Sequence, residues 1–254
     1  MSYTNPILRT GASSGQSIYS TVTTPLHPVG SSAALPDGRE YVYVCNRNAA
    51  IATGKLCKFN EVSTNYDLCV IPTQTTGSLA LGSTVLDVTL AGSSTIAANQ
   101  FAGDFLNIDD DAGEGTLYKI LGNTAVAAGT AITLQIEPLR VAITTSTTVT
   151  LVNYAQDVQI ADNNQTQKVA GVTQFGVGAG STTPVYFWLQ NKGLCSVLMN
   201  GTPAVGTPLV PSATTAGAVD ATAEAGSGIY DNVVGTMVSL AGVTTEHHVA
   251  WINV

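Results

Sequence analysis

The stretch from Gly103 to Leu139 constrains the fold more than any other part of this 254-residue chain. Three short apolar runs lie here between turn residues, and in the last run Ile132, Leu134 and Ile136 alternate with polar residues. A period of two is typical of a half-buried strand, and runs this close in sequence pair most easily as antiparallel neighbours. The stretch therefore predicts a β-meander, and we expect a further strand at 147–152 to close the same unit.

The composition extends this prediction to the whole chain. Charged residues make up 10% and hydrophobic residues 44%, and Thr, Ser, Gly and Asn dominate the rest, which favours strands and turns over amphipathic helices. The predicted class is therefore all-β. Soluble monomers usually carry about 25% charged residues, so the shortfall indicates that another protein covers part of this surface. We expect a homo-oligomer, with a trimer preferred.

The charge balance bears on the kind of partner. Seventeen acidic and nine basic residues give a net charge of −8, and no cluster of Lys and Arg offsets it. Binding to phosphates needs such a cluster, so nucleic acid is not an expected partner. The sequence also contains no apolar run of signal-peptide or membrane-span length. We therefore expect no membrane partner and synthesis in the cytoplasm.

Three regions follow along the chain. Residues 1–38 contain four prolines among Gly, Ser and Thr, and predict an extended N-terminal arm that crosses a neighbouring subunit or another partner. Residues 39–153 predict a β domain that contains the meander and begins with a hairpin of 41–45 and 55–59. Residues 154–254 predict a compact β-barrel or β-sandwich, because turn signals recur there at short intervals. The arm has four apolar residues as candidate partner-binding anchors: Ile7, Leu8, Ile18 and Tyr19.

The acidic turn after Ile108 is the nearest approach to a metal motif. Asn107, Asp109 and Asp111 resemble the start of a calcium loop. However, Ala112 stands where such loops need glycine, and no acidic residue follows at the distal ligand position. We therefore predict a solvated surface turn, no metal site and no cofactor.

Other reactive residues give no catalytic pattern. Glu246, His247 and His248 are adjacent on an expected strand, where successive side chains point to opposite faces, so a structural or interfacial role is preferred. His27 lies in the arm without a partner in sequence. The cysteines have no C-x-x-C spacing, so we expect buried small hydrophobes, with a disulfide as the alternative: Cys45, Cys57, Cys69 and Cys195. The sequence predicts no catalytic residue and no enzyme activity.

Three segments resemble structural proteins of tailed phages. The segment 103–144, with GEGTLYKI and ITLQIEPLRVAIT, looks like a block common in such proteins. The segments AGVTQFGVGAG and VYFWLQNKGLCSVLMNGTPAVGTPLV are similar to the small β-barrel of head decoration, or cement, proteins. The runs VVGTMVSL and VAWINV resemble the closing strands of that barrel. The resemblance covers about residues 84–254.

The resemblance implies a protein without catalysis that binds the outer surface of a phage head and stabilises it. Its partner would be the major capsid protein, and its location the capsid surface of the virion. The meander domain is a departure, because small decoration proteins lack it.

Two other classes remain open. A tail or baseplate component, or a module that binds a receptor or a glycan, would share the all-β composition. It would need an exposed aromatic groove, for which Trp188 and Trp251 are the indole candidates. A virion-associated hydrolase would need a convergent polar site.

Overall fold

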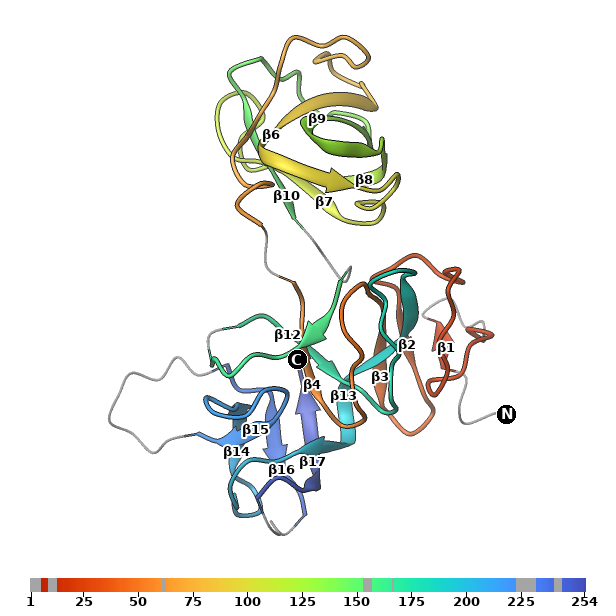
Figure 1. Ribbon diagram of the computed structural model, residues 1–254, viewed down its shortest axis with the longest axis vertical. Helices are drawn as coiled ribbons and strands as arrows, with labels where there is room; N and C mark the ends of the chain where they lie inside the picture. The colour runs from red at the N-terminus through yellow and green to blue at the C-terminus, as the bar shows by residue number, and fades with distance from the viewer. Residues whose placement is uncertain are drawn as a thin grey trace. The chain divides into compact units, whose positions relative to one another are not determined.

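The chain forms two compact units (Figure 1). The computed structural model describes residues 6–8, 13–60, 63–152, 157–165, 167–222, 232–239 and 244–254. All of the regular secondary structure assigned within these ranges is β-strand, so the predicted all-β class is confirmed. Unit 1 comprises Met1–Asn60 and Asp157–Val254, and unit 2 comprises Glu61–Gln156.

Unit 2 is a closed barrel in the order β10-β5-β6-β9-β8-β7. In β9, Ile132, Leu134 and Ile136 are buried, whereas Thr133 and Gln135 between them are not. This alternation points one face of the strand into the barrel, and closure pairs the edges that an open sheet would expose. The strands are β5 (Cys69–Val70), β6 (Val85–Ile96), β7 (Phe105–Ile108), β8 (Leu117–Asn123), β9 (Val126–Ile136) and β10 (Thr148–Val152).

The predicted meander is confirmed within this barrel. β7 pairs antiparallel with β8, and β8 with β9. β10 closes the unit by pairing with both β7 and β5, as the run at 147–152 predicts. The turn between β7 and β8 uses the left-handed conformation at Asp111 (φ 63°), Gly113 (φ 91°) and Gly115 (φ 77°). Asp and Gly adopt this conformation at low cost, which explains their place in the turn.

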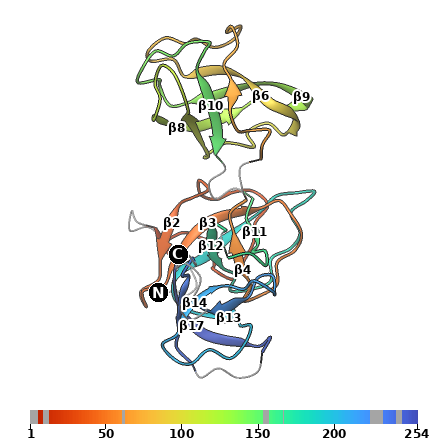
Figure 2. The same ribbon diagram turned by 90° about the vertical axis from the view of Figure 1, so that its left-hand side faces the viewer.

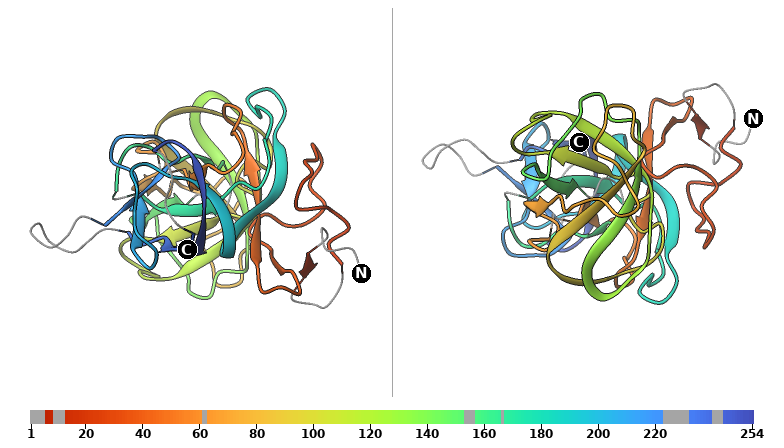
Figure 3. Two further views of the ribbon diagram at one scale, coloured as in Figure 1. Left: turned by 90° about the horizontal axis from the view of Figure 1, so that it is seen from below. Right: turned by 90° about the horizontal axis from the view of Figure 1, so that it is seen from above.

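Unit 1 is built on an eleven-stranded sheet whose main path runs β1-β2-β3-β13-β17-β16-β14-β15. β4 pairs with β11 and β12, and β12 also pairs with β13. Figure 2 shows this unit from the side, and in Figure 3 the red N-terminal segment and the blue C-terminal strands lie on different sides of it. The strands are β1 (Ile7–Leu8), β2 (Ser32–Ala34), β3 (Glu40–Asn46), β4 (Leu56–Lys58), β11 (Gln159–Ile160), β12 (Val169–Val172), β13 (Val185–Leu198), β14 (Pro208–Pro211), β15 (Val219–Ala221), β16 (Gly235–Met237) and β17 (His247–Asn253).

β13 is the longest strand, with 14 residues, and it joins two parts of unit 1. Its first half pairs with β3 and its second half with β17, with a register shift between Gln190 and Lys192. A parallel bridge between Met199 and Val219 brings β15 back beside the end of β13. The strands after β13 therefore surround a shared aliphatic core, which includes Val197, Leu209 and Ile252.

The predicted division at residues 38 and 153 differs from the observed units. Residues 39–60 are part of unit 1, together with the C-terminal strands. The predicted hairpin of 41–45 with 55–59 is also wrong, because these two strands do not pair with each other. β3 pairs with β2 and β13, whereas β4 pairs with β11 and β12. The physical reason is burial, because Tyr41 to Asn46 are buried on both faces, and a two-stranded hairpin cannot cover both. The boundary at 153 lies close to the observed end of unit 2 at Gln156.

The described part of the predicted arm folds onto its own unit. Ile18 is completely buried, and the hydroxyl of Tyr43 donates to Oε1 of Gln16 at 2.9 Å. Nε2 of Gln16 in turn donates to the carbonyl of Tyr186 at 3.2 Å. The aromatic side chains of β3 and β13 would otherwise face water, so residues 13–36 cover them. Residues 1–5 and 9–12 of the predicted arm lie outside the described residues.

Candidate functional site

The four predicted anchor residues divide between the interior and the surface. Ile18 lies in the core of unit 1, and Leu8 is partly buried against the same cluster. The prediction that Ile18 binds a partner is therefore corrected, because its side chain has no exposed surface, whereas Leu8 keeps part of its surface and also lines a groove. Ile7 is 36% exposed and Tyr19 is 50% exposed. Only these two of the four predicted anchors present substantial surface to a partner.

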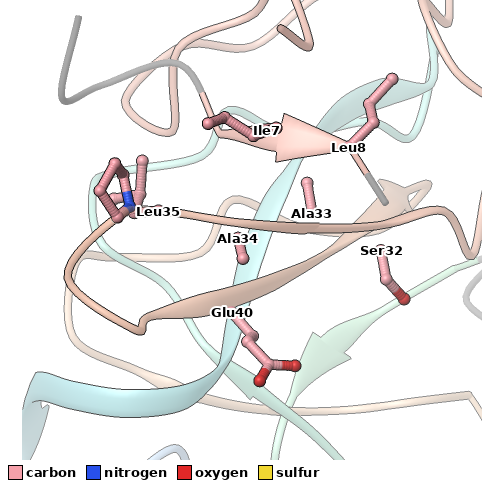
Figure 4. A pocket seen from close by; sticks show the side chains of 8 residues that line it. Ile7, Leu8, Ser32, Ala33, Ala34, Leu35 and Glu40 are labelled. Atoms are coloured by element: carbon pink, nitrogen blue, oxygen red, sulfur yellow. The ribbon is translucent and has the colours of Figure 1, made fainter. Parts of the chain in front are cut away.

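An apolar groove of about 310 Å³ lies beside β1 and β2 (Figure 4). Figure 4 shows Ile7 and Leu35 on the same side of the groove, whereas the carboxylate of Glu40 lies at its opposite margin. Ala33 projects between β1 and β2 toward Leu8. The groove therefore combines aliphatic walls with one acidic group at the rim. Its lining residues are Ile7, Leu8, Ser32, Ala33, Ala34, Leu35, Pro36 and Glu40.

A second surface lies on the outward face of β13, β17 and β16. Along β17, Ala250 and Ile252 point into the core, and Val249 and Trp251 point outward. Trp251 is 45% exposed, and in the sheet register it lies between Leu194 of β13 and Thr236 of β16. The exposed indole thus stands on central strands of the sheet, whose hydrogen bonds fix its position.

Two hollows flank the side chain of Trp251. The larger, of about 490 Å³, is also lined by Lys192, Val233, Gly235, Thr236 and Asn253. The smaller, of about 300 Å³, is also lined by Asp37, Arg39 and Leu194. The indole is the side chain common to both, so it forms a ridge between them. We call this surface the Trp251 ridge.

Ion pairs supply the charged groups around the ridge. Arg39 contacts the carboxylate of Asp37 at 2.8 Å, and the ammonium group of Lys192 contacts Glu40 at 2.9 Å. Hydrogen bonding to Asp37 raises the pKa of Arg39 above its usual range, and the hydrogen bond from Arg39 lowers the pKa of Asp37. In both pairs the charge of the basic side chain is compensated by a carboxylate within salt-bridge distance.

The structure separates the two indole candidates of the sequence. Trp188 is completely buried, with its ring 4.9 Å from Tyr43 and 5.4 Å from His27 between ring centroids. His27 therefore has a partner in space, although it has none in sequence. Trp188 is a core residue, and Trp251 is the indole that a ligand can reach.

The acidic turn is held by hydrogen bonds from neighbouring hydroxyls. Thr150 donates to Asp109 at 2.7 Å, and the hydroxyl of Thr144 donates to the carboxylate of Asp111. Among the described residues, no group of three or more His, Cys, Asp or Glu side chains is arranged to hold a metal ion. These hydrogen bonds explain the conformation of the acidic turn.

His247 contacts a turn of its own unit. Its Nε2 lies 3.1 Å from the carbonyl oxygen of Thr53, and a side chain on Gly54 would collide with its ring. This contact is compatible with the predicted structural or interfacial role of His247.

The four cysteines are free and buried, as the preferred interpretation of the sequence predicts. Burial raises the pKa of Cys57 and of Cys195 to about 12. Burial also raises the pKa values of Cys45 and Cys69, more than neighbouring groups lower them. A thiolate is the reactive form of cysteine, so these side chains act as small hydrophobes at neutral pH.

Sequence reasoning missed the polar residues around Trp251, namely Arg39, Thr236 and Lys192. They come from segments far apart in sequence, and only the pairing of β13 with β3 and β17, and of β16 with β17, brings them together. The sequence did contain one signal of this surface, because the alternation in HHVAWIN places Val249 and Trp251 on one face of the strand.

No helix in the described ranges is long and apolar enough to cross a membrane. Comparison with protein-family models, curated proteins and solved structures gives no match.

Proposed function

We propose that this chain is a non-enzymatic virion protein that binds the outer face of a tailed-phage head and stabilises the shell. The segments that carry the resemblance support this proposal by their arrangement. The block at 103–144 contributes β7, β8 and β9 to one barrel, and the segment 185–254 forms β13 to β17 around one core. The proposed partner is the major capsid protein, and the proposed location is the capsid surface.

The observation that carries the proposal is the exposed apolar surface of the N-terminal segment. Ile7 remains exposed although its neighbour Leu8 is partly buried, and it borders the apolar groove beside β1. Tyr19 likewise remains exposed beside the buried Ile18. The segment thus has one face that holds it to unit 1 and another that is free to bury apolar area against a capsid.

The location is tested on particles of the virus whose genome encodes this chain. Electron microscopy with an antibody against the chain is expected to show label over the head. Label on the tail or baseplate would contradict capsid decoration and support the alternative virion role.

The binding surface is tested with a matched pair of variants, Ile7→Ser and Leu81→Ser. Both replace an exposed aliphatic side chain, but Leu81 lies in unit 2. Ile7 is 36% exposed, so burying its remaining surface on the head contributes about 0.5–1 kcal/mol, and its loss costs about two- to fivefold in Kd. Binding to heads that lack the protein should weaken by that factor for Ile7→Ser and stay unchanged for Leu81→Ser. Equal binding by both variants would remove the groove from the proposed interface.

Self-association belongs to the same proposal. We expect a trimer, because a surface with so few charges needs cover and heads present threefold positions. Sedimentation equilibrium at micromolar concentration measures the mass directly. A monomer would contradict this expectation.

A further inference from the structure

We propose that the Trp251 ridge is a binding site for a neutral saccharide. This inference does not depend on capsid decoration, because the ridge and the groove beside Ile7 share no lining residue. It rests on the position of the indole, the size of the hollows and the charge around them.

The indole supplies a stacking surface. A pyranose ring has a face of C–H bonds and a rim of hydroxyl groups, so it packs on an aromatic face while its rim stays polar. Trp251 is exposed, and Val249 and Leu194 extend the apolar surface beside it. These side chains lie on paired strands in the interior of the sheet, so the surface is formed before a ligand arrives.

The hollows supply hydrogen bonds on both sides of the ring. Their volumes of about 490 Å³ and 300 Å³ lie near the range of small-ligand sites, about 300–1,000 Å³. Thr236 and Asn253 offer uncharged donors and acceptors in the larger hollow. Arg39 and Asp37 place a donor beside an acceptor in the smaller one. A vicinal diol can accept a hydrogen bond from the cation of such a pair and donate a hydrogen bond to its carboxylate.

The charge favours a neutral ligand. Arg39 is compensated by Asp37 and Lys192 by Glu40, so neither cation is left to attract an anionic group. The chain as a whole carries a net charge of −8, which opposes an acidic polysaccharide. A neutral polyhydroxyl ligand matches both the paired ions and the apolar ridge.

The two tryptophans make fluorescence a direct test, because Trp188 is buried and Trp251 is exposed. Acrylamide quenching of the intact protein should therefore report mainly on Trp251. The probes are maltotetraose, cellotetraose, chitotetraose and mannotetraose, with tetragalacturonate as the acidic comparison. We expect at least one neutral tetrasaccharide to protect Trp251 from quenching, and tetragalacturonate to give no protection.

Variants then locate the site by isothermal titration calorimetry. Trp251→Ala should weaken binding of the protecting sugar about tenfold or more, as expected for loss of a stacked ring. Trp251→Tyr should recover part of that loss, and Leu81→Ala in unit 2 should bind as the unchanged protein does. Lys192→Met should weaken binding less than Trp251→Ala and leave the melting temperature unchanged, because exposed ion pairs add little stability.

Four results would overturn the proposal. The first is that no neutral tetrasaccharide protects Trp251, and the second is that Trp251→Ala binds as well as the unchanged protein. The third is protection by tetragalacturonate alone. The fourth is a lower sedimentation mass for Trp251→Ala, which would assign the ridge to contact between protein copies. Label on virion heads is expected whether or not a sugar binds, so the two proposals fail separately.

Discussion

At the scale of single residues, Asp87 shows how unit 2 stabilises a carboxylate that is only 8% exposed. It accepts hydrogen bonds from the backbone N–H groups of Thr75 and Thr76, both at 2.8 Å, and of Gly77 at 3.3 Å. The hydroxyl of Thr133 on β9 donates to its other oxygen at 2.8 Å. Asp87 thus ties the 75–77 segment to the barrel wall. Burial alone would raise the pKa of Asp87, but these bonds outweigh it and hold the pKa well below its usual range.

Asp87→Asn should therefore lower the free energy of unfolding of unit 2 at neutral pH by about 1–3 kcal/mol, because charge-assisted hydrogen bonds are lost. The folded pKa is lowered, so the carboxylate stabilises the fold above the unfolded pKa of about 3.9 and loses that effect as pH falls. Urea unfolding followed by circular dichroism at pH 7 and pH 3 should show a smaller difference between the two proteins at pH 3. Glu114→Gln, at an exposed position, is the control. A difference that is constant with pH would contradict a charge effect.

At the scale of elements, the N-terminal segment is part of the fold of unit 1. Its core cluster joins Ile18 and Ala33 to Tyr41, Tyr43 and Trp188 of β3 and β13. Val22 forms a bridge with Tyr186, which ties the segment to β13 as well. The prolines that predict an extended arm are compatible with this arrangement, because Pro excludes helix interiors and central strands but not a covering loop.

The neighbours Ile18 and Tyr19 provide a test of this role. Ile18→Ala should destabilise unit 1 by about 2–5 kcal/mol, because it leaves a cavity beneath the segment. Tyr19→Ala should change stability little, since half of that side chain is exposed. Trp188 packs in the same cluster, so its fluorescence in a denaturant titration reports the transition. Equal midpoints for the two variants would indicate that the segment contributes nothing to folding.

At the scale of the whole molecule, unit 2 is an insertion in unit 1. On the unit 1 side, Nδ2 of Asn60 donates to the carboxylate of Asp157 at 2.8 Å, so the two points of insertion are adjacent. On the unit 2 side, the N–H of Leu151 donates to the carbonyl of Tyr66 at 2.9 Å, so the ends of the barrel are adjacent too. Adjacent ends and separate cores are the usual conditions for inserting one domain into another.

Residues 61–156 should therefore fold when expressed alone. The expected result is a β-sheet circular dichroism spectrum and one cooperative thermal transition. The remaining chain, with 61–156 replaced by a short Gly-Ser linker, should keep a second transition, because Asn60 and Asp157 already lie together. Calorimetry of the full chain should then resolve into these two transitions. An unfolded barrel fragment would show that unit 2 depends on unit 1.

The sequence by itself determined the β class and the meander of β7, β8 and β9. The partners of these strands are close along the chain, so their alternation and turn residues carry the whole pattern. Tertiary structure alone decided the pairing of β3 with β13 and of β4 with β11 and β12, because these partners lie more than 90 residues further along. It also decided which indole is exposed. Trp188 and Trp251 both lie in apolar strand sequences, but Trp188 is covered by the N-terminal segment, whereas Trp251 points away from the core. Alternation specifies that a strand has two faces, and only packing specifies which of them is covered.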